Sequence, residues 1–229
     1  MSNYAYAQDS STRSLLSQVF AWMSLALAIT GITAFFVYSH EATRQLLVTK
    51  PGLLIGLLIV QLIVVLAFSF LVYRVSFAVA LFLFLFYAFL TGVTLSIIFL
   101  AYTMSSIAST FGIAALLFGS MALYGYVTNR DLSSMGSLLS MALWGVIIAM
   151  VVNVFLQNTM FNTIISVVAV LLFTGLTAYD VQRIKQIATV MNRNNEEYYK
   201  ISLVGALTLY LDFINLFLNL LQLTGRRRE

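Results

Sequence analysis

The sequence contains seven apolar stretches, each of about the length that an α-helix needs to cross a lipid bilayer. The hydrocarbon core is about 30 Å thick and a helix rises about 1.5 Å per residue, so a span needs about 20 residues. We therefore predict an all-α membrane protein, a bundle of seven transmembrane helices. The stretches are residues 15–38, 52–73, 76–102, 107–128, 136–157, 161–182 and 202–224.

The composition supports this class and excludes several kinds of site. Hydrophobic residues make up 61% of the chain and charged residues 9%, whereas soluble domains carry about 25% charged residues. The absence of cysteine excludes disulfides and thiolate metal sites, and the single histidine, His40, excludes a histidine cluster. Lys and Arg lie in loops and tails rather than on a basic face. We expect the lipid bilayer, and no nucleic acid, as a partner.

The stretches form one predicted transmembrane domain, residues 15–224, between a polar N-terminal tail, residues 1–14, and a basic C-terminal tail, residues 225–229. The N-terminal tail lacks the features of a cleavable signal peptide. With seven spans, the N-terminal side collects 7 Lys and Arg residues and the opposite side 5, so we place the N-terminus inside. A re-entrant last helix would change this tally to 10 against 2, and that alternative stays open.

The last stretch carries one polar stripe with an acid at its centre. At about 100° per residue, the side chains of Thr208, Asp212, Asn215 and Asn219 fall on one face of the helix. A carboxylate in hydrocarbon costs on the order of 3 kcal/mol, so this stripe must face other helices or water. We predict that the last helix is central. In the alternative reading, Asp212 is a neutral, hydrogen-bonded acid that only holds helices together.

A second acid, Asp180, lies at the end of the sixth stretch. Sequential helices run antiparallel and pack as neighbours, so we expect Asp180 and Asp212 to meet near the inner face. Two adjacent carboxylates share a proton and titrate as a pair, and once deprotonated they offer oxygen ligands to Ca²⁺. In the alternative reading, Asp180 only pairs with Arg183 at the membrane surface.

Four groups of residues are similar to the motifs of a known family. By these motifs the chain, from about Arg13 to Gly225, resembles the Bax inhibitor family of multi-pass membrane proteins, especially its bacterial inner-membrane branch. The resemblance implies that six helices surround the last one, and that an aspartate pair, here Asp180 and Asp212, governs a pH-sensitive Ca²⁺ leak. The motifs are Thr91-Gly-Val-Thr-Leu-Ser96, Leu123-Tyr-Gly-Tyr126 with Arg130-Asp-Leu-Ser133, Gly175-Leu-Thr-Ala-Tyr-Asp180 and Leu207-Thr-Leu-Tyr-Leu-Asp-Phe-Ile-Asn-Leu-Phe217.

Two positions in the second stretch depart from the pattern of that family. Some members carry a glutamate where this chain has Gln61, and an arginine latch at the position of Leu71. Arg74 lies about one turn further on. We therefore name Arg74 and Arg183 as candidates for a latch or a local ion pair.

Two functions remain open. A pH-sensitive leak for Ca²⁺ or protons explains the two acids and the polar stripe, whereas a non-transporting regulator that binds a membrane-bound protease or a cell-death or stress partner is compatible with the same fold. We expect no enzyme and no cofactor. Tyr179-Asp180 matches half of the intramembrane aspartyl protease signature, but Asp212 follows Leu-Tyr-Leu where those enzymes need Gly-x-Gly.

Three lesser features are given structural roles. Gly112, Gly119 and Gly125 are expected to permit close helix approach, as small residues do in membranes. Asp131 is expected to cap the fifth helix, and Gln61 to form an interhelical hydrogen bond.

Overall fold

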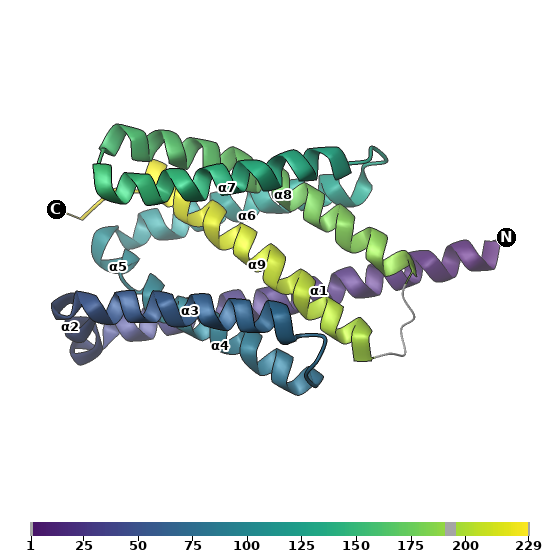
Figure 1. Ribbon diagram of the computed structural model, residues 1–229, viewed down its shortest axis with the longest axis horizontal. Coiled ribbons are helices and arrows are strands. Elements are labelled where there is room, and N and C mark those ends of the chain that lie inside the picture. The colour runs from purple at the N-terminus through teal and green to yellow at the C-terminus, as the bar shows by residue number, and fades with distance from the viewer. Residues whose placement is uncertain (1, 191–195, 229) are drawn as a thin grey trace. The chain divides into compact units, whose positions relative to one another are not determined.

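The computed structural model describes residues 2–190 and 196–228, and it consists of helices joined by short connections (Figure 1). Among these residues, 7 helices are long and apolar enough to cross a membrane, which confirms the predicted all-α membrane class. The spans are Thr12–Ser39, Gly52–Leu71, Phe77–Ala101, Met104–Val127, Ser133–Leu156, Thr159–Thr189 and Glu196–Thr224.

The helix bounds extend or divide several of the predicted stretches; α8 continues to Val190, and α9 begins at Glu196. Helix α1 begins at Ser2, so the polar segment 2–14 continues the first span as helix. The third stretch ends as helix at Leu95 and resumes, after a turn, as the four-residue helix α5. The helices are α1 Ser2–Ser39, α2 Glu41–Thr49, α3 Pro51–Leu71, α4 Phe77–Leu95, α5 Ile98–Ala101, α6 Met104–Val127, α7 Ser133–Leu156, α8 Thr159–Val190 and α9 Glu196–Thr224.

The chain divides into two packing units. The first unit contains Met1–Tyr102, Ala188–Leu207 and Arg228–Glu229, and the second contains Thr103–Ile187 and Thr208–Arg227. Helix α9 contributes its first part to one unit and the remainder to the other. The single domain predicted for residues 15–224 therefore stays a prediction, and so does the side of the membrane on which each terminus lies. Arg193, which was counted in the charge tally, lies outside the described residues.

In the first unit, α1 packs closely against α4. A Cβ atom added to Gly92 of α4 would lie 2.7 Å from the Thr30 carbonyl oxygen of α1, and the Thr30 hydroxyl donates to the carbonyl of Ala88 at 2.9 Å. Only a residue without a side chain fits this crossing. The absence of a side chain at position 92 thus sets the distance between the two helices.

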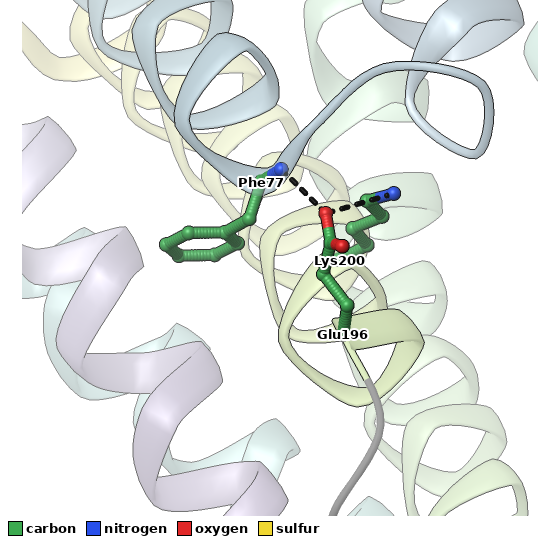
Figure 2. A network of polar contacts seen from close by, with 3 residues as sticks. All are labelled: Phe77, Glu196 and Lys200. Atoms are coloured by element: carbon green, nitrogen blue, oxygen red, sulfur yellow. Dashed lines mark hydrogen bonds and ion pairs between the residues drawn. The ribbon is translucent and has the colours of Figure 1, made fainter.

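The start of α9 is tied to the start of α4. Ser76, the N-cap of α4, provides no side-chain cap, and the Glu196 carboxylate accepts the Phe77 N–H at 2.8 Å instead. Figure 2 shows the same carboxylate oxygen paired with Lys200, one turn along α9, at 3.1 Å. A carboxylate is favourable at this position because helix N-termini carry unpaired N–H groups and a partial positive charge.

Helix α9 is the most buried of the spans. In its most apolar window, 61% of the residues are buried, compared with 56% for α8 and 33% or less for the others. The central position of this helix stays a prediction, because its two parts belong to different packing units.

Candidate functional site

The two predicted acids lie together in the second unit. The side chains of Asp180 in α8 and Asp212 in α9 are joined by a hydrogen bond. They are only 8% and 5% exposed. Two carboxylate oxygens can share a hydrogen bond only when a proton lies between them, so the arrangement is that of an acid pair holding one proton.

Glycines bring the neighbouring helices close to the Asp180 segment of α8. A Cβ atom at Gly125 of α6 would collide with the backbone of Ala178, and one at Gly136 of α7 would collide with the ring of Tyr179. Both contacts lie within two residues of Asp180. Close approach was expected at Gly125, but the same expectation is wrong for Gly112 and Gly119, because nothing lies within 4 Å of a Cβ at either position.

The next residues of α8 hold the connection between α6 and α7. The Gln182 side chain uses both ends: its oxygen accepts the Leu132 N–H at 2.9 Å, and its amide nitrogen donates to the Arg130 carbonyl at 2.8 Å. The Lys185 ammonium donates to the Tyr126 carbonyl at 2.8 Å. Three side-chain hydrogen bonds therefore hold this part of α8 in place.

Aromatic packing fixes the rotation of α9. The ring of Phe213 packs edge to face against Phe111 and Phe118 of α6, with centroids 5.2 and 5.5 Å apart. Phe217, one turn later, contacts the same Phe111 ring at 5.9 Å. Because these side chains turn one face of α9 toward α6, the face that carries Asp212 is turned toward α7 and α8.

A cavity of about 410 Å³ lies beside the acid pair, between α7, α8 and α9. Asp212 lines it, and its Oδ2 atom is buried without a hydrogen-bond partner among the described residues. The lining residues are Ser140, Leu143, Val146, Ile147, Met150, Phe173, Leu176, Tyr179, Asp180, Arg183, Thr208, Leu211, Asp212 and Asn215.

The predicted polar stripe is divided by this cavity. Thr208 and Asn215 line it together with Asp212. Asn219 does not; its amide donates to the Asn215 carbonyl at 2.8 Å. Asn215 donates in the same way to Leu211, also at 2.8 Å. Both amides thus bond to their own helix, and only Asn215 borders the space next to the acids.

The two candidate arginines lie in different units. Arg183 lines the cavity and is exposed, and its charge acts on Asp180. The alternative reading of Asp180 required this interaction with Arg183. Asp180 has it in addition to its hydrogen bond with Asp212, not instead of that bond. Arg74 lies in the turn after α3, in the first unit. Its assignment as a latch stays a prediction.

Sequence reasoning missed the side chains of α7 that line the cavity, and it missed the role of Gln182. Leu143, Val146, Ile147 and Met150 follow each other at spacings of three, one and three residues, which is the pattern of one helix face. That pattern marks a face but does not say what it covers. Gln182 belonged to no predicted site, although a glutamine at the end of a predicted stretch could have been recognised as a residue that needs hydrogen-bond partners.

The site contains too few ligands for a closed metal centre. Among the described residues, no group of three or more His, Cys, Asp and Glu side chains could hold a metal ion. The acid pair supplies four carboxylate oxygens, whereas Ca²⁺ takes about six to eight oxygen ligands. A cation at this pair would therefore have to keep water molecules or use the neighbouring hydroxyl and amide groups.

Comparison with known proteins gives one family over nearly the whole chain. The family described as "Inhibitor of apoptosis-promoting Bax1" matches residues 12–229. The inner membrane protein YbhL of Escherichia coli (strain K12) is 45% identical over 214 residues, which are 93% of this chain and 92% of the relative. An uncharacterised protein of Borreliella burgdorferi is 43% identical, with the same coverage. The protein RP147 of Rickettsia prowazekii is 41% identical over 96% of this chain and 93% of its own.

Proposed function

Because the chain belongs to the Bax inhibitor family and is a multi-pass membrane protein, we propose that it is a pH-sensitive cation leak of a bacterial inner membrane, gated by Asp180 and Asp212. The observation that carries the proposal is the hydrogen-bonded acid pair beside a cavity of about 410 Å³. Ionisable residues within membrane spans are rare and mark ion or proton pathways. YbhL, the E. coli relative, is named an inner membrane protein, which supports the location.

The gating step is the loss of the shared proton. While the proton is present, the two carboxyl groups hold α8 and α9 together at this level. When it leaves, two negative charges face each other and either repel or recruit a cation. Because each acid belongs to a different helix, separation requires a movement of α8 relative to α9 rather than of side chains alone.

The incomplete ligand set supports a leak rather than a storage site. Conduction requires that an ion binds well enough to enter and weakly enough to leave. Four carboxylate oxygens with Thr208 and Asn215 beside them are fewer ligands than a closed Ca²⁺ site has, which supports reversible rather than tight binding. The proposal contains no chemical step, and the ion passes unchanged.

The test is ion flux in liposomes that contain only the purified protein. We expect Ca²⁺ flux to rise as the pH rises through the titration of the pair and to be low in acid, because acid supplies the closing proton. Binding of Ca²⁺ should weaken in acid with the same midpoint. Absence of flux at every pH, or flux that is indifferent to pH, would contradict the proposal.

The second candidate is a regulator that binds a membrane protein, such as a membrane-bound protease. One observation favours it: only 6% of the residues in the apolar window of α7 are buried, the lowest value of the seven spans. An apolar helix face of this kind contacts either lipid or another protein. A protein that gives no flux alone but alters a partner's activity in the same liposomes would support this role.

A further inference from the structure

The end of α1 carries a tyrosine that two arginines approach from distant parts of the sequence. Tyr38 is the last residue but one of the span Thr12–Ser39. The guanidinium carbon of Arg44, in α2, lies 5.9 Å from the centroid of the Tyr38 ring, and that of Arg228 lies 5.5 Å from it. Cation–π contacts form within about 6 Å of a ring centroid. One side chain at the end of a span therefore gathers two positive charges.

The position of Arg228 is set by two hydrogen bonds. Its backbone N–H donates to the Ala101 carbonyl of α5 at 3.0 Å, and its Nη1 donates to the Tyr38 hydroxyl at 2.7 Å. Phe99 stacks on the same tyrosine ring, with centroids 5.4 Å apart. All four residues, and Arg44, belong to the first unit. The arginines are thus placed by contacts within one packing unit.

The charges of the two arginines are not balanced by an acid. Neither guanidinium forms an ion pair with a carboxylate in the part of the chain that the structure describes. Arg44 is half-buried and Arg228 is exposed, so a ligand can reach both. A guanidinium carries several N–H donors, and the Tyr38 hydroxyl accepts from only one nitrogen of Arg228. An anion that contacts both arginines would use the remaining donors and remove the repulsion between the two charges.

An apolar face of α1 leads from these arginines into the span. Phe35 and Gly31 precede Tyr38 at spacings of three and then four residues, so the three positions follow one face of the helix. The Phe35 side chain is 52% exposed. At Gly31, nothing lies within 4 Å of an added Cβ atom, which leaves room for a chain beside the helix. The site thus has a charged end and an apolar continuation.

We propose that Arg44, Tyr38 and Arg228 bind the headgroup of an anionic phospholipid. The phosphate oxygens accept hydrogen bonds from the two guanidinium groups, and one acyl chain lies along Phe35 and Gly31. Arginine binds phosphate through parallel N–H···O bonds, which are stronger than bonds between neutral groups. Tyrosine and arginine at the end of a span lie at the level of the lipid headgroups.

The charges at the site decide between ligand classes. Two guanidinium groups repel a cation, and the headgroup of a zwitterionic lipid would add a third positive charge beside them. A free phosphate ion would pair with the arginines but leave the apolar face of α1 uncovered. Glu41, an acid in the first turn of α2, is exposed, so its charge is screened by solvent. An anionic lipid is the ligand that matches both ends.

The inference is independent of the proposed function, because the site lies in the first unit and uses neither Asp180 nor Asp212. Its test is native mass spectrometry of the purified protein in detergent, titrated with phosphatidylglycerol or with phosphatidylcholine of the same acyl chains. We expect the first phosphatidylglycerol to bind about tenfold more tightly, because only its headgroup carries a net negative charge. Equal affinities would overturn the inference and leave the arginines to an acidic segment of a partner protein.

A matched pair of double variants locates the lipid. Arg44→Gln combined with Arg228→Gln should abolish the preference for phosphatidylglycerol. Lys50→Gln combined with Arg227→Gln removes the same charge, from an exposed residue of the Arg44–Lys50 segment and from the exposed neighbour of Arg228. This control should keep at least about half of the preference, because attraction by net charge alone is weakened by screening. An equal loss in both double variants, or no loss in the first, would overturn the inference.

Two further measurements test the hydroxyl and the acyl chain. Tyr38→Phe keeps the ring and removes the acceptor of Arg228, so phosphatidylglycerol should bind about threefold more weakly. If the arginine double variant does not fold, unchanged affinity in Tyr38→Phe would overturn the inference. Glycerophosphoglycerol, the headgroup without acyl chains, should displace the lipid only at concentrations at least about a hundredfold higher, because it buries no apolar surface. Displacement at equal concentration would show a site for free anions and overturn the assignment to lipid.

Discussion

Gln61 in the first packing unit and Asp212 in the second are both polar side chains buried in an apolar span, and their surroundings differ. Gln61 of α3 is satisfied at both ends: its amide nitrogen donates to the Thr91 hydroxyl at 3.0 Å, and its oxygen accepts from the Thr94 hydroxyl at 3.4 Å. Asp212 of α9 has the carboxyl group of Asp180 as its hydrogen-bond partner.

The difference lies in the number of states that each group can adopt. An amide and two hydroxyls do not titrate between acid and neutral pH, so the Gln61 network has one arrangement. An acid pair has one arrangement with the shared proton and another without it. The comparison teaches that a buried polar group can stabilise a helix contact or switch it, and that its ability to gain or lose a proton distinguishes the two roles.

The largest effect is expected from the acids themselves. Asp180→Asn and Asp212→Asn should each abolish the pH dependence of flux, and the double variant should add little, because either change alone removes the pair. We expect a coupling of about 1–3 kcal/mol in a double-mutant cycle on flux. Asp131→Asn, an exposed acid outside the spans, is the control. Additive effects would mean that the two acids act separately.

A smaller effect is expected from the contact that positions Asp180. Gly125→Ala places a methyl group against the backbone of Ala178 and should destabilise the protein by about 1–3 kcal/mol, the usual cost of overpacking. The matched control is Gly119→Ala on the same helix, where a Cβ meets nothing within 4 Å. Thermal unfolding in detergent compares the two. Equal unfolding temperatures would show that α6 can move away from α8 without cost.

Gln61→Leu tests the neutral side of the comparison. The Thr91 hydroxyl would still donate to the Tyr87 carbonyl, at 2.9 Å, and the one proton of the Thr94 hydroxyl could turn to the Thr91 carbonyl, at 3.0 Å. The loss should therefore be near 1 kcal/mol, the net value of an ordinary hydrogen bond. Flux should keep its dependence on pH. If that dependence disappears in Gln61→Leu, the pH response does not belong to the second unit alone.

The smallest effect is expected at Asp131, on the surface. Hydrogen bonds from the Ser133 hydroxyl and N–H hold the pKa of Asp131 below its ordinary value. A group whose pKa is lowered by folding stabilises the protein above its ordinary pKa, near 3.9, and this contribution is lost as the pH falls through the lower, folded-state value. Asp131→Ala should lower the unfolding temperature slightly at neutral pH, and the difference should shrink in acid. A difference that grows in acid would contradict this assignment.

The sequence predicted the elements better than their contacts. Seven spans follow from the length of the apolar stretches, because the bilayer imposes that length. The acids could be paired in advance because they lie on successive helices. The cavity lining from α7 and the contacts of Gln182 could not be predicted in advance. They depend on the rotation of α7 and on the path of the connection after Tyr126. Gly125 and Gly119 look alike in the sequence, and only the position of α8 separates them.

The two hydrogen bonds of Gln182 link the buried acid pair to the connection between α6 and α7 at the surface. They join α8, two residues after Asp180, to the backbone at Arg130 and Leu132. A tilt of α8 that separates the acids must therefore carry this connection along. A spectroscopic label on the exposed Arg130 side chain would then report the protonation of a pair that is itself almost fully buried.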